Sequence, residues 1–370
     1  MFELTNEQRA CFGLEAVQPH WTRLVLKPRR YQQTTTIAYL EGCTVKKYVE
    51  SGDHLYRECG VYEQVSEDYR YLLPKTAKGK PVLLSTATLE KRIRGMYLMY
   101  HSDPGRPHIP AHISLFNIDS QREYYCSMSE ALLLPNIDAF RQWVEQWYAE
   151  STPDDLVDVA RFAAQPRIHV NFQEGDVFRF KLDRRLYGYG RILLNYDLMR
   201  KRKEPFWDSL MGKPLVCSAY RIATERKDVT TAELEQLGSL PSEYMMDNHL
   251  FYGGYEIIGH IPVTEQEDYP IRYGYSTNAR CKDLLLQCGR VHRKIENGTA
   301  LYEHYQNCGI GYQMHIRLPV LRQCIQAQSN DPHWAQDNAW ANYDLRNPKL
   351  RPQLEEICRQ FDLSPEQLLK

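Results

Sequence analysis

Three residues near the end of the chain have the types that bind zinc: Cys281, Cys288 and His292. Zinc sites in proteins use Cys sulfur and His nitrogen, and a helix presents residues at i and i+4 on one face. If this segment is helical, Cys288 and His292 share a face. No acidic or thiol partner stands at ligand spacing around them. We therefore interpret them as buried structural residues and predict no metal site.

Two further histidines, His249 and His260, flank the run LFYGGYEIIGH and could approach one another across a turn. A hydrogen-bonded structural role is our interpretation for both. The patterns HExxH, GxSxG and GxxxxGK[ST] are absent, and no third glycine after Gly188 and Gly190 opens a helix, so the dinucleotide fingerprint is absent too. The residues therefore predict no catalytic site and no cofactor.

Basic runs at Lys27–Arg30, Lys75–Lys80 and Arg200–Lys203 point to a different chemistry, nucleic-acid binding. A β-barrel with exposed Tyr and Arg can stack bases. The whole chain is balanced, however, with 46 Lys and Arg against 47 Asp and Glu, so no global field attracts a polyanion. Short basic runs usually lie on solvated turns. A nucleic-acid-associated β protein is therefore kept as an alternative, not as the leading hypothesis.

The segment Glu174–Leu194, EGDVFRFKLDRRLYGYGRILL, predicts the element around which the rest is arranged. Val177 to Leu182 alternates apolar and polar residues, as a half-buried strand does, and the turn Asp183–Arg185 follows. The next strand carries Gly188 and Gly190 on one face, and alternate glycines suit a sharp bend. We predict a curved hairpin in a barrel-like domain, with structural roles for Gly188, Gly190 and the glycines of a second strand, Gly253 and Gly254.

We expect an α+β fold with an N-terminal antiparallel β domain, a central barrel-like β domain and a C-terminal helical region. The parts are 1–150, a linker helix 151–166, a β domain 167–276 and a helical extension 277–370. An apolar stripe predicts a helix over Asn136–Tyr148, and Thr152 followed by Pro153 predicts the next helix start. A capping box is expected at Thr230 and Glu233. In the extension the predicted helices are Asn278–Ile295, Thr299–Asn307, Val320–Ala327 and Lys349–Gln360.

No run approaches the ~20 apolar residues of a membrane span, and the N-terminus lacks the apolar core of an export signal. The ten cysteines are scattered and include no CxxC pair. Both observations favour a cytoplasmic protein with reduced, mostly buried thiols and no membrane partner.

The hairpin segment, followed by MGKPLVCSAYRI, LPSEYMMDNHLFYGGYEIIGHIPV and DYP, resembles the immunity protein 26 family of bacterial polymorphic toxin systems. The resemblance runs from about Ile168 to about Tyr275. Upstream, LTNEQRACFGL and LLPKTAKGKP are similar to the N-terminal region of longer members. These are fold motifs without catalytic residues.

The resemblance implies a non-enzymatic, cytoplasmic immunity protein, or antitoxin, used in bacterial competition. Its partner would be the C-terminal domain of a cognate toxin delivered by contact-dependent inhibition or type VI secretion. It would occlude the toxin's active site or trap the toxin inactive. The alternative within this setting is an enzyme that reverses the toxin's modification of its target.

Protein interfaces favour aromatic anchors and charge complementarity. The anchor candidates are Tyr187, Tyr189 and Tyr252, and core roles are the alternative for them. If the toxin is a basic nuclease, Glu265, Glu267 and Asp268 could mimic phosphates, and a merely hydrated turn is the alternative.

Overall fold

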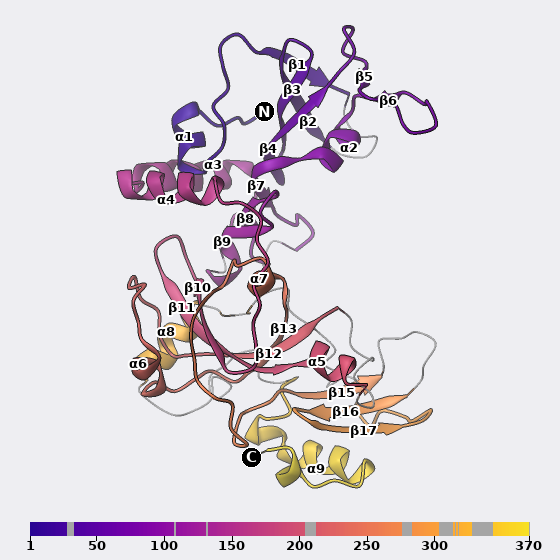
Figure 1. Cartoon of the computed structure of the whole chain (residues 1–370), viewed down its shortest axis with the longest axis vertical. Helices are drawn as coiled ribbons and strands as arrows, with labels where there is room; N and C mark the ends of the chain where they lie inside the picture. Colours follow the sequence, from indigo (N-terminus) through magenta and orange to yellow (C-terminus); the bar gives the residue numbers. More distant parts are fainter. Residues whose placement is uncertain are drawn as a thin grey trace. The chain divides into compact units, whose positions relative to one another are not determined.

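The computed structural model describes residues 1–27, 33–106, 109–130, 132–203, 212–275, 283–302, 314, 316, 318–327 and 343–369. They form two compact units, Met1–Ile168 and His169–Lys370 (Figure 1). Both units are built from antiparallel sheets with helices packed on them, so the predicted α+β class is confirmed. The finer four-part division of the chain stays a prediction.

The first unit contains a seven-stranded antiparallel sheet in the order β1-β2-β3-β4-β7-β8-β9. Its strands are β1 (Thr22–Leu26), β2 (Thr34–Glu41), β3 (Thr44–Gly52), β4 (Leu55–Gln64), β7 (Arg94–His101), β8 (His112–Asn117) and β9 (Arg122–Cys126). A two-stranded sheet, β5 (Tyr71–Leu72) with β6 (Val82–Leu83), and the short helices α2 (Thr86–Leu89), η1 (Glu90–Arg92) and η2 (Ser127–Ser129) complete it.

Helices α1 (Asn6–Cys11), α3 (Ile137–Ala149) and α4 (Pro153–Ala163) share one core with this sheet (Figure 1). The predicted stripe of α3 is confirmed, because Phe140, Val144 and Trp147 are buried. The predicted start of α4 is confirmed as well. Thr152 caps the helix and forms a capping box with Asp155, with Pro153 in the first turn.

The second unit is organised around a five-stranded sheet in the order β13-β12-β11-β10-β14. The strands are β10 (Asp176–Lys181), β11 (Tyr187–Asn195), β12 (Pro214–Ala219), β13 (Glu243–Met246) and β14 (Glu256–His260). Because β13 and β14 are separate edges, the sheet is open, and the expectation of a barrel-like domain is wrong. Short helices α5 (Tyr196–Lys201), α6 (Thr231–Glu235) and α7 (Asn248–Phe251) connect the strands, and the capping box at Thr230 and Glu233 is confirmed.

The strand predicted over Leu250–His260 is wrong in its first half. Leu250 lies in α7, Gly253 follows with a φ of +69°, and β14 begins only at Glu256. A positive φ is readily adopted by glycine, so Gly253 reverses the chain between helix and strand.

A three-stranded sheet, β15-β16-β17, follows in the same unit, with β15 at Ile271–Tyr275, β16 at Leu284–Cys288 and β17 at Val291–Ile295. The helix predicted over Asn278–Ile295 is therefore wrong for residues 284–295, and residues 278–282 lie outside the described part. Gly289, with a φ of +54°, turns the hairpin. The apolar run Leu284–Leu286 fits a buried strand as well as a helix, so periodicity alone could not decide.

One face of this three-stranded sheet packs on α9 (Arg351–Gln360), and α8 (Leu318–Gln326) joins the core of the five-stranded sheet. These two helices confirm the predictions at Lys349–Gln360 and Val320–Ala327. Residues 299–302 are not helical, and residues 303–307 of the helix predicted there lie outside the described part. The 3-10 turns η7 (Pro348–Leu350) and η8 (Pro365–Gln367) flank α9. No helix within the described ranges has the length and apolar content that a membrane crossing requires.

Candidate functional site

The two glycines of β11 lie directly opposite phenylalanines of β10. Gly188 pairs with Phe180, and Gly190 pairs with Phe178. A Cβ atom on Gly188 would lie 2.7 Å from Phe180 Cζ; one on Gly190 would lie 2.6 Å from Phe178 Cζ and 2.8 Å from the Ser218 carbonyl oxygen. The aromatic rings thus occupy the space above the glycines. This packing supports the proposed structural role of Gly188 and Gly190.

Replacing Gly188 by valine is expected to lower the free energy of unfolding by more than ~1 kcal/mol, because the added methyl groups collide with Phe180 and Leu182. Urea unfolding of the purified chain measures the change. Gly105→Val is the matched control, since the nearest atom to a Cβ at Gly105 is the flexible Asp103 carboxylate at 3.3 Å. Equal unfolding midpoints for the two variants would contradict the assignment.

Tyr187 and Tyr189 are buried on the other face of the hairpin. Tyr189 is fully buried and its hydroxyl donates to the Arg226 carbonyl oxygen at 2.7 Å. The ring of Tyr187 is 8% exposed and lies beneath the Arg179 guanidinium at 5.4 Å and the Lys227 ammonium at 5.3 Å. Both rings belong to a hydrophobic cluster of the unit, so they leave little surface for a partner.

Tyr252, at the end of α7, lies instead in a partly exposed group that we call the aromatic patch: His169, Phe251, Tyr252 and Lys213. The His169 ring stacks on Phe251 with centroids 4.5 Å apart, and Tyr252 packs edge-on against Phe251 at 5.1 Å. The Lys213 ammonium lies 5.5 Å from the Phe251 centroid. Aromatic rings beside a cation are typical of contact surfaces.

The three acids of the turn at 264–268 have different surroundings. Glu267 forms an ion pair with Arg191 and accepts a hydrogen bond from the Thr264 backbone N–H at 3.0 Å. Asp268 accepts from the Ser242 backbone N–H at 2.9 Å and from Arg346 at 2.5 Å. Glu265 is exposed, and no described residue forms an ion pair with it. Glu267 and Asp268 therefore have partners within the unit, whereas Glu265 is exposed without an ion pair to any described residue.

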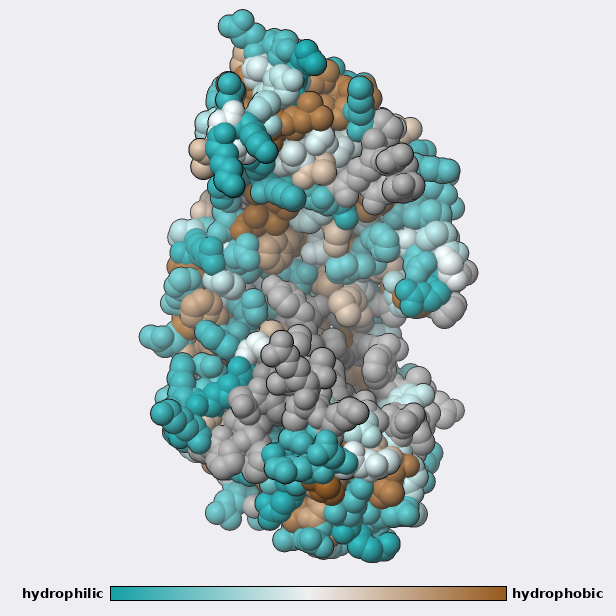
Figure 2. Space-filling model, turned by 90° about the vertical axis from the view of Figure 1, so that its right-hand side faces the viewer, coloured by the Kyte–Doolittle hydropathy of each residue, from teal (hydrophilic) through white to brown (hydrophobic). Residues whose placement is uncertain are grey.

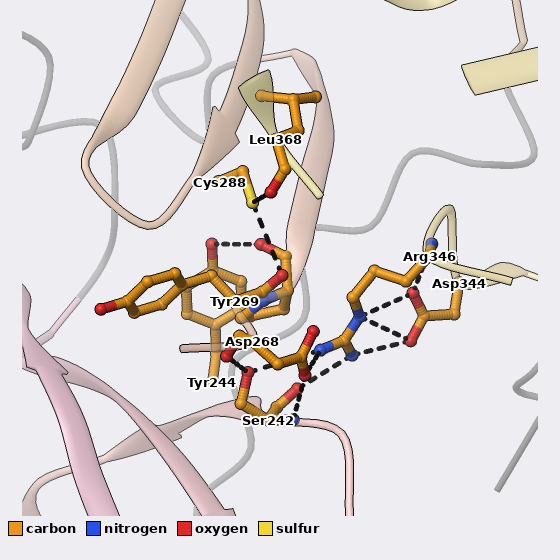
Figure 3. Close-up of polar contacts among 9 residues, drawn as sticks. Ser242, Tyr244, Asp268, Tyr269, Cys288, Asp344, Arg346 and Leu368 are labelled. Atoms are coloured by element: carbon orange, nitrogen blue, oxygen red, sulfur yellow. Dashed lines mark hydrogen bonds and ion pairs between the residues drawn. The ribbon is translucent and has the colours of Figure 1, made fainter. Parts of the chain in front are cut away.

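Arg346 links the C-terminal segment to this turn (Figure 3). Its side chain is 5% exposed and donates to both carboxylate oxygens of Asp344, to Asp268 and to the Ser242 carbonyl oxygen, the last at 2.9 Å. These two carboxylates raise the pKa of Arg346 although burial acts in the opposite direction. Nearby, the Cys288 thiol donates to the carbonyl oxygens of Tyr269 and Leu368. The segment 343–369 is thereby held against the residues that precede β13 and against the connection between β14 and β15.

The residues considered for zinc do not come together. Cys288 faces the core on α9, whereas His292 lies on the opposite face of the sheet, paired with Gln287. The predicted i, i+4 helical arrangement is therefore wrong, because the two residues lie on successive strands; Cys281 is outside the described part. Across the residues that the structure describes, no three His, Cys, Asp or Glu side chains are placed to hold a metal ion.

His249 and His260 have separate partners. His249 is buried against the Tyr255 ring, with centroids 4.8 Å apart, and burial lowers its pKa to about 4. His260 Nδ1 lies 3.0 Å from the Asp176 carboxylate. Both contacts are consistent with the structural interpretation.

The sequence analysis missed one group of potentially reactive side chains. On β8 and β9 of the first unit, Cys126 Sγ lies 3.7 Å from His112 Nε2, and Ser114 donates to Glu123 at 3.0 Å. Burial raises the pKa of Glu123 to about 7. A nucleophilic thiolate needs a nearby cation, and this carboxyl group, which also contacts Cys126, opposes its formation. Cys126 and His112 are 14 residues apart in sequence, and the pairing of β8 with β9 brings them into contact.

The surface is predominantly hydrophilic on the face drawn in Figure 2, with hydrophobic side chains in small groups. Within the described residues of the second unit, only Leu301 and Tyr343 are large hydrophobic side chains with high exposure. The predicted basic loop Lys75–Lys80 is exposed throughout; Arg29 and Arg30 lie outside the described part. A partner of the second unit would therefore contact charged and aromatic edges and not a broad apolar face.

Residues 173–285 match the family model described as Immunity protein 26. The match covers β10 to β14 and β15, and it ends inside β16. Neither the curated proteins nor the solved structures gave a significant match to the chain.

Proposed function

We propose that this chain is an immunity protein that binds and neutralises a cognate secreted toxin in the cytoplasm, because residues 173–285 match the Immunity protein 26 family model. The family match is the observation that carries the proposal. Binding is the mechanism we propose, by occlusion of the toxin's active site or by trapping it inactive. Delivery of the toxin by type VI secretion or contact-dependent inhibition belongs to the same proposal.

The exposed candidates of the second unit define where we expect the toxin to bind. Tyr252 in the aromatic patch can supply an amphipathic anchor, and Glu265 can supply an exposed negative charge. Tyr187, Tyr189, Glu267 and Asp268 are already used within the unit, so their contribution to binding would be indirect. A basic toxin surface, as on a nuclease, would complement Glu265.

Two substitutions test this surface. Tyr252→Ala is expected to weaken toxin binding by about 10-fold to 100-fold, since buried aromatic anchors contribute most of the energy of an interface. Glu265→Lys is expected to slow association, most strongly at low salt. Surface plasmon resonance against the toxin C-terminal domain measures both effects, with Glu145→Lys on α3 of the first unit as the matched charge-reversal control.

The affinity measurements test where the toxin binds, and co-expression tests whether binding is the mechanism of protection. Unchanged affinity for both variants, with wild-type melting temperatures, would move the binding surface elsewhere. If co-expression protects cells but no complex with the toxin domain co-purifies, the binding mechanism is wrong. An enzyme that reverses the toxin's modification would then replace it, with Cys126 and His112 as the first residues to substitute.

A further inference from the structure

Three polar side chains lie in a row across one face of the sheet β15-β16-β17. Arg272 pairs with Gln287, and Gln287 pairs with His292. Residues directly opposite on antiparallel strands present their side chains to the same face. The other face of the sheet packs on α9. All three residues are buried, with exposed fractions of 2%, 0% and 7%.

The guanidinium of Arg272 has no hydrogen-bond partner in the described structure. Its Nε, Nη1 and Nη2 atoms are all buried and unpaired, and so are Oε1 and Nε2 of Gln287. Arginine does not lose its proton in proteins, so the positive charge remains. A buried charge without a counter-charge is strongly unfavourable. Arg346 in the same unit shows the usual solution, with two carboxylates around it.

Three described residues near Arg272, which are Tyr196, Tyr244 and His292, are polar and uncharged. The hydroxyls of Tyr196 on α5 and Tyr244 on β13 lie 3.3 Å apart, and the charge of Arg272 acts on both phenols. Burial raises the pKa of Tyr244 to about 12, and burial also raises the pKa of Tyr196 well above its ordinary value, so both phenols stay neutral. Burial, with the charge of Arg272, lowers the pKa of His292 to about 4, so this ring is neutral too.

We propose that Arg272 and Gln287 form a binding site for a small oxoanion, with the two tyrosine hydroxyls beside it. The guanidinium fork matches two oxygens of a phosphate or a carboxylate, and the Gln287 amide adds a further donor. The small exposed fractions restrict the ligand to a compact, nearly enclosed anion and exclude a peptide or a nucleic-acid strand.

The site joins two parts of the unit. Arg272 lies within the family match, whereas Gln287 lies just after its end at residue 285. The segment that follows the matched residues therefore completes the site. A bound anion would link β15 to β16 and to α5. This anion site is separate from the proposed toxin-binding surface, because no residue of the aromatic patch takes part in it.

Thermal unfolding of the full chain tests the site. Inorganic phosphate and sulfate are titrated against sodium chloride at matched ionic strength, and acetate and citrate form the carboxylate arm. We expect a saturable rise in melting temperature with one of the two anion classes, because a ligand that binds only the folded state stabilises it. Arg272→Met should lose this rise, whereas Arg293→Met, an exposed arginine on β17, should keep it.

A different set of melting temperatures would contradict the anion site. If no anion raises the melting temperature above the chloride control and Arg272→Met melts higher than the wild type, Arg272 is an uncompensated buried charge and the proposal is wrong. If Arg272→Met fails to fold, the Gln287→Leu variant is used to test the anion site. It removes a neutral group, and the proposal requires the anion concentration at half-saturation to rise several-fold.

Discussion

Replacing Arg346 by methionine is expected to lower the free energy of unfolding of the second unit by about 3–5 kcal/mol, because Asp344, which is 20% exposed, and the more exposed Asp268 lose their shared buried cation. The Ser242 carbonyl oxygen loses a donor as well. Since Arg346 joins the C-terminal segment to the turn that contains Asp268, hydrogen exchange of the α9 amides should accelerate.

The control for this prediction is Arg351→Met on α9. Arg351 is 39% exposed and pairs with Glu355 at 3.0 Å, and such surface pairs contribute about 0–1 kcal/mol. Urea unfolding and hydrogen exchange are measured on both variants. A loss at Arg346 no larger than the loss at Arg351 would show that the buried network is not what holds the segment.

Replacing Glu58 by glutamine is expected to destabilise the first unit by about 3–5 kcal/mol. Glu58 is fully buried and accepts hydrogen bonds from Arg9 Nε at 2.7 Å, Lys47 Nζ at 2.5 Å and the Tyr56 hydroxyl at 2.6 Å. Without the carboxylate, two buried cations face one another. Because Arg9 lies on α1 and Lys47 on β3, the helix should detach first. Glu63→Gln, on the same strand with a half-buried Arg92 pair at 3.5 Å, is the control.

The same carboxylate predicts a pH dependence. Burial alone would raise the pKa of Glu58, but Lys47 and Arg9 outweigh it and hold the pKa below its ordinary value. A lowered carboxyl pKa contributes stability above the unfolded value of about 4.3, and this stability is lost as the pH falls through the folded pKa. The stability difference between wild type and Glu58→Gln should therefore shrink in acid. A constant difference from pH 7 to pH 3 would contradict the assignment.

The elements that were predicted correctly depend on neighbouring residues. The apolar stripe of α3, the Thr152 cap of α4 and the Thr230 capping box each involve positions within one or two helical turns. The hairpin β10–β11 is likewise local, since its alternation and its glycines lie within 21 residues that the family match also covers. These signals can therefore be recognised without any tertiary contact.

The incorrect predictions share a different cause. Leu284–Leu286 fits a strand or a helix, and the pairing with β15 decided for a strand. Five strands could close into a barrel or remain open, and the separate edges β13 and β14 show that they remain open. In each case the choice depends on partners that are distant in sequence, which periodicity does not contain.

The α+β class, the caps at Thr152 and Thr230 and the resemblance of the central segment to the Immunity protein 26 family were predictable from the sequence, because these signals depend on residues a few positions apart. Which candidate side chains face solvent became clear from the tertiary contacts. It places Tyr189 in the core, pairs Glu267 with Arg191, and joins Arg346 to Ser242 and Asp268 across 104 and 78 residues. Burial and ion pairing depend on such contacts between residues distant in sequence. In the same structure Glu265 is exposed and Tyr252 is partly exposed.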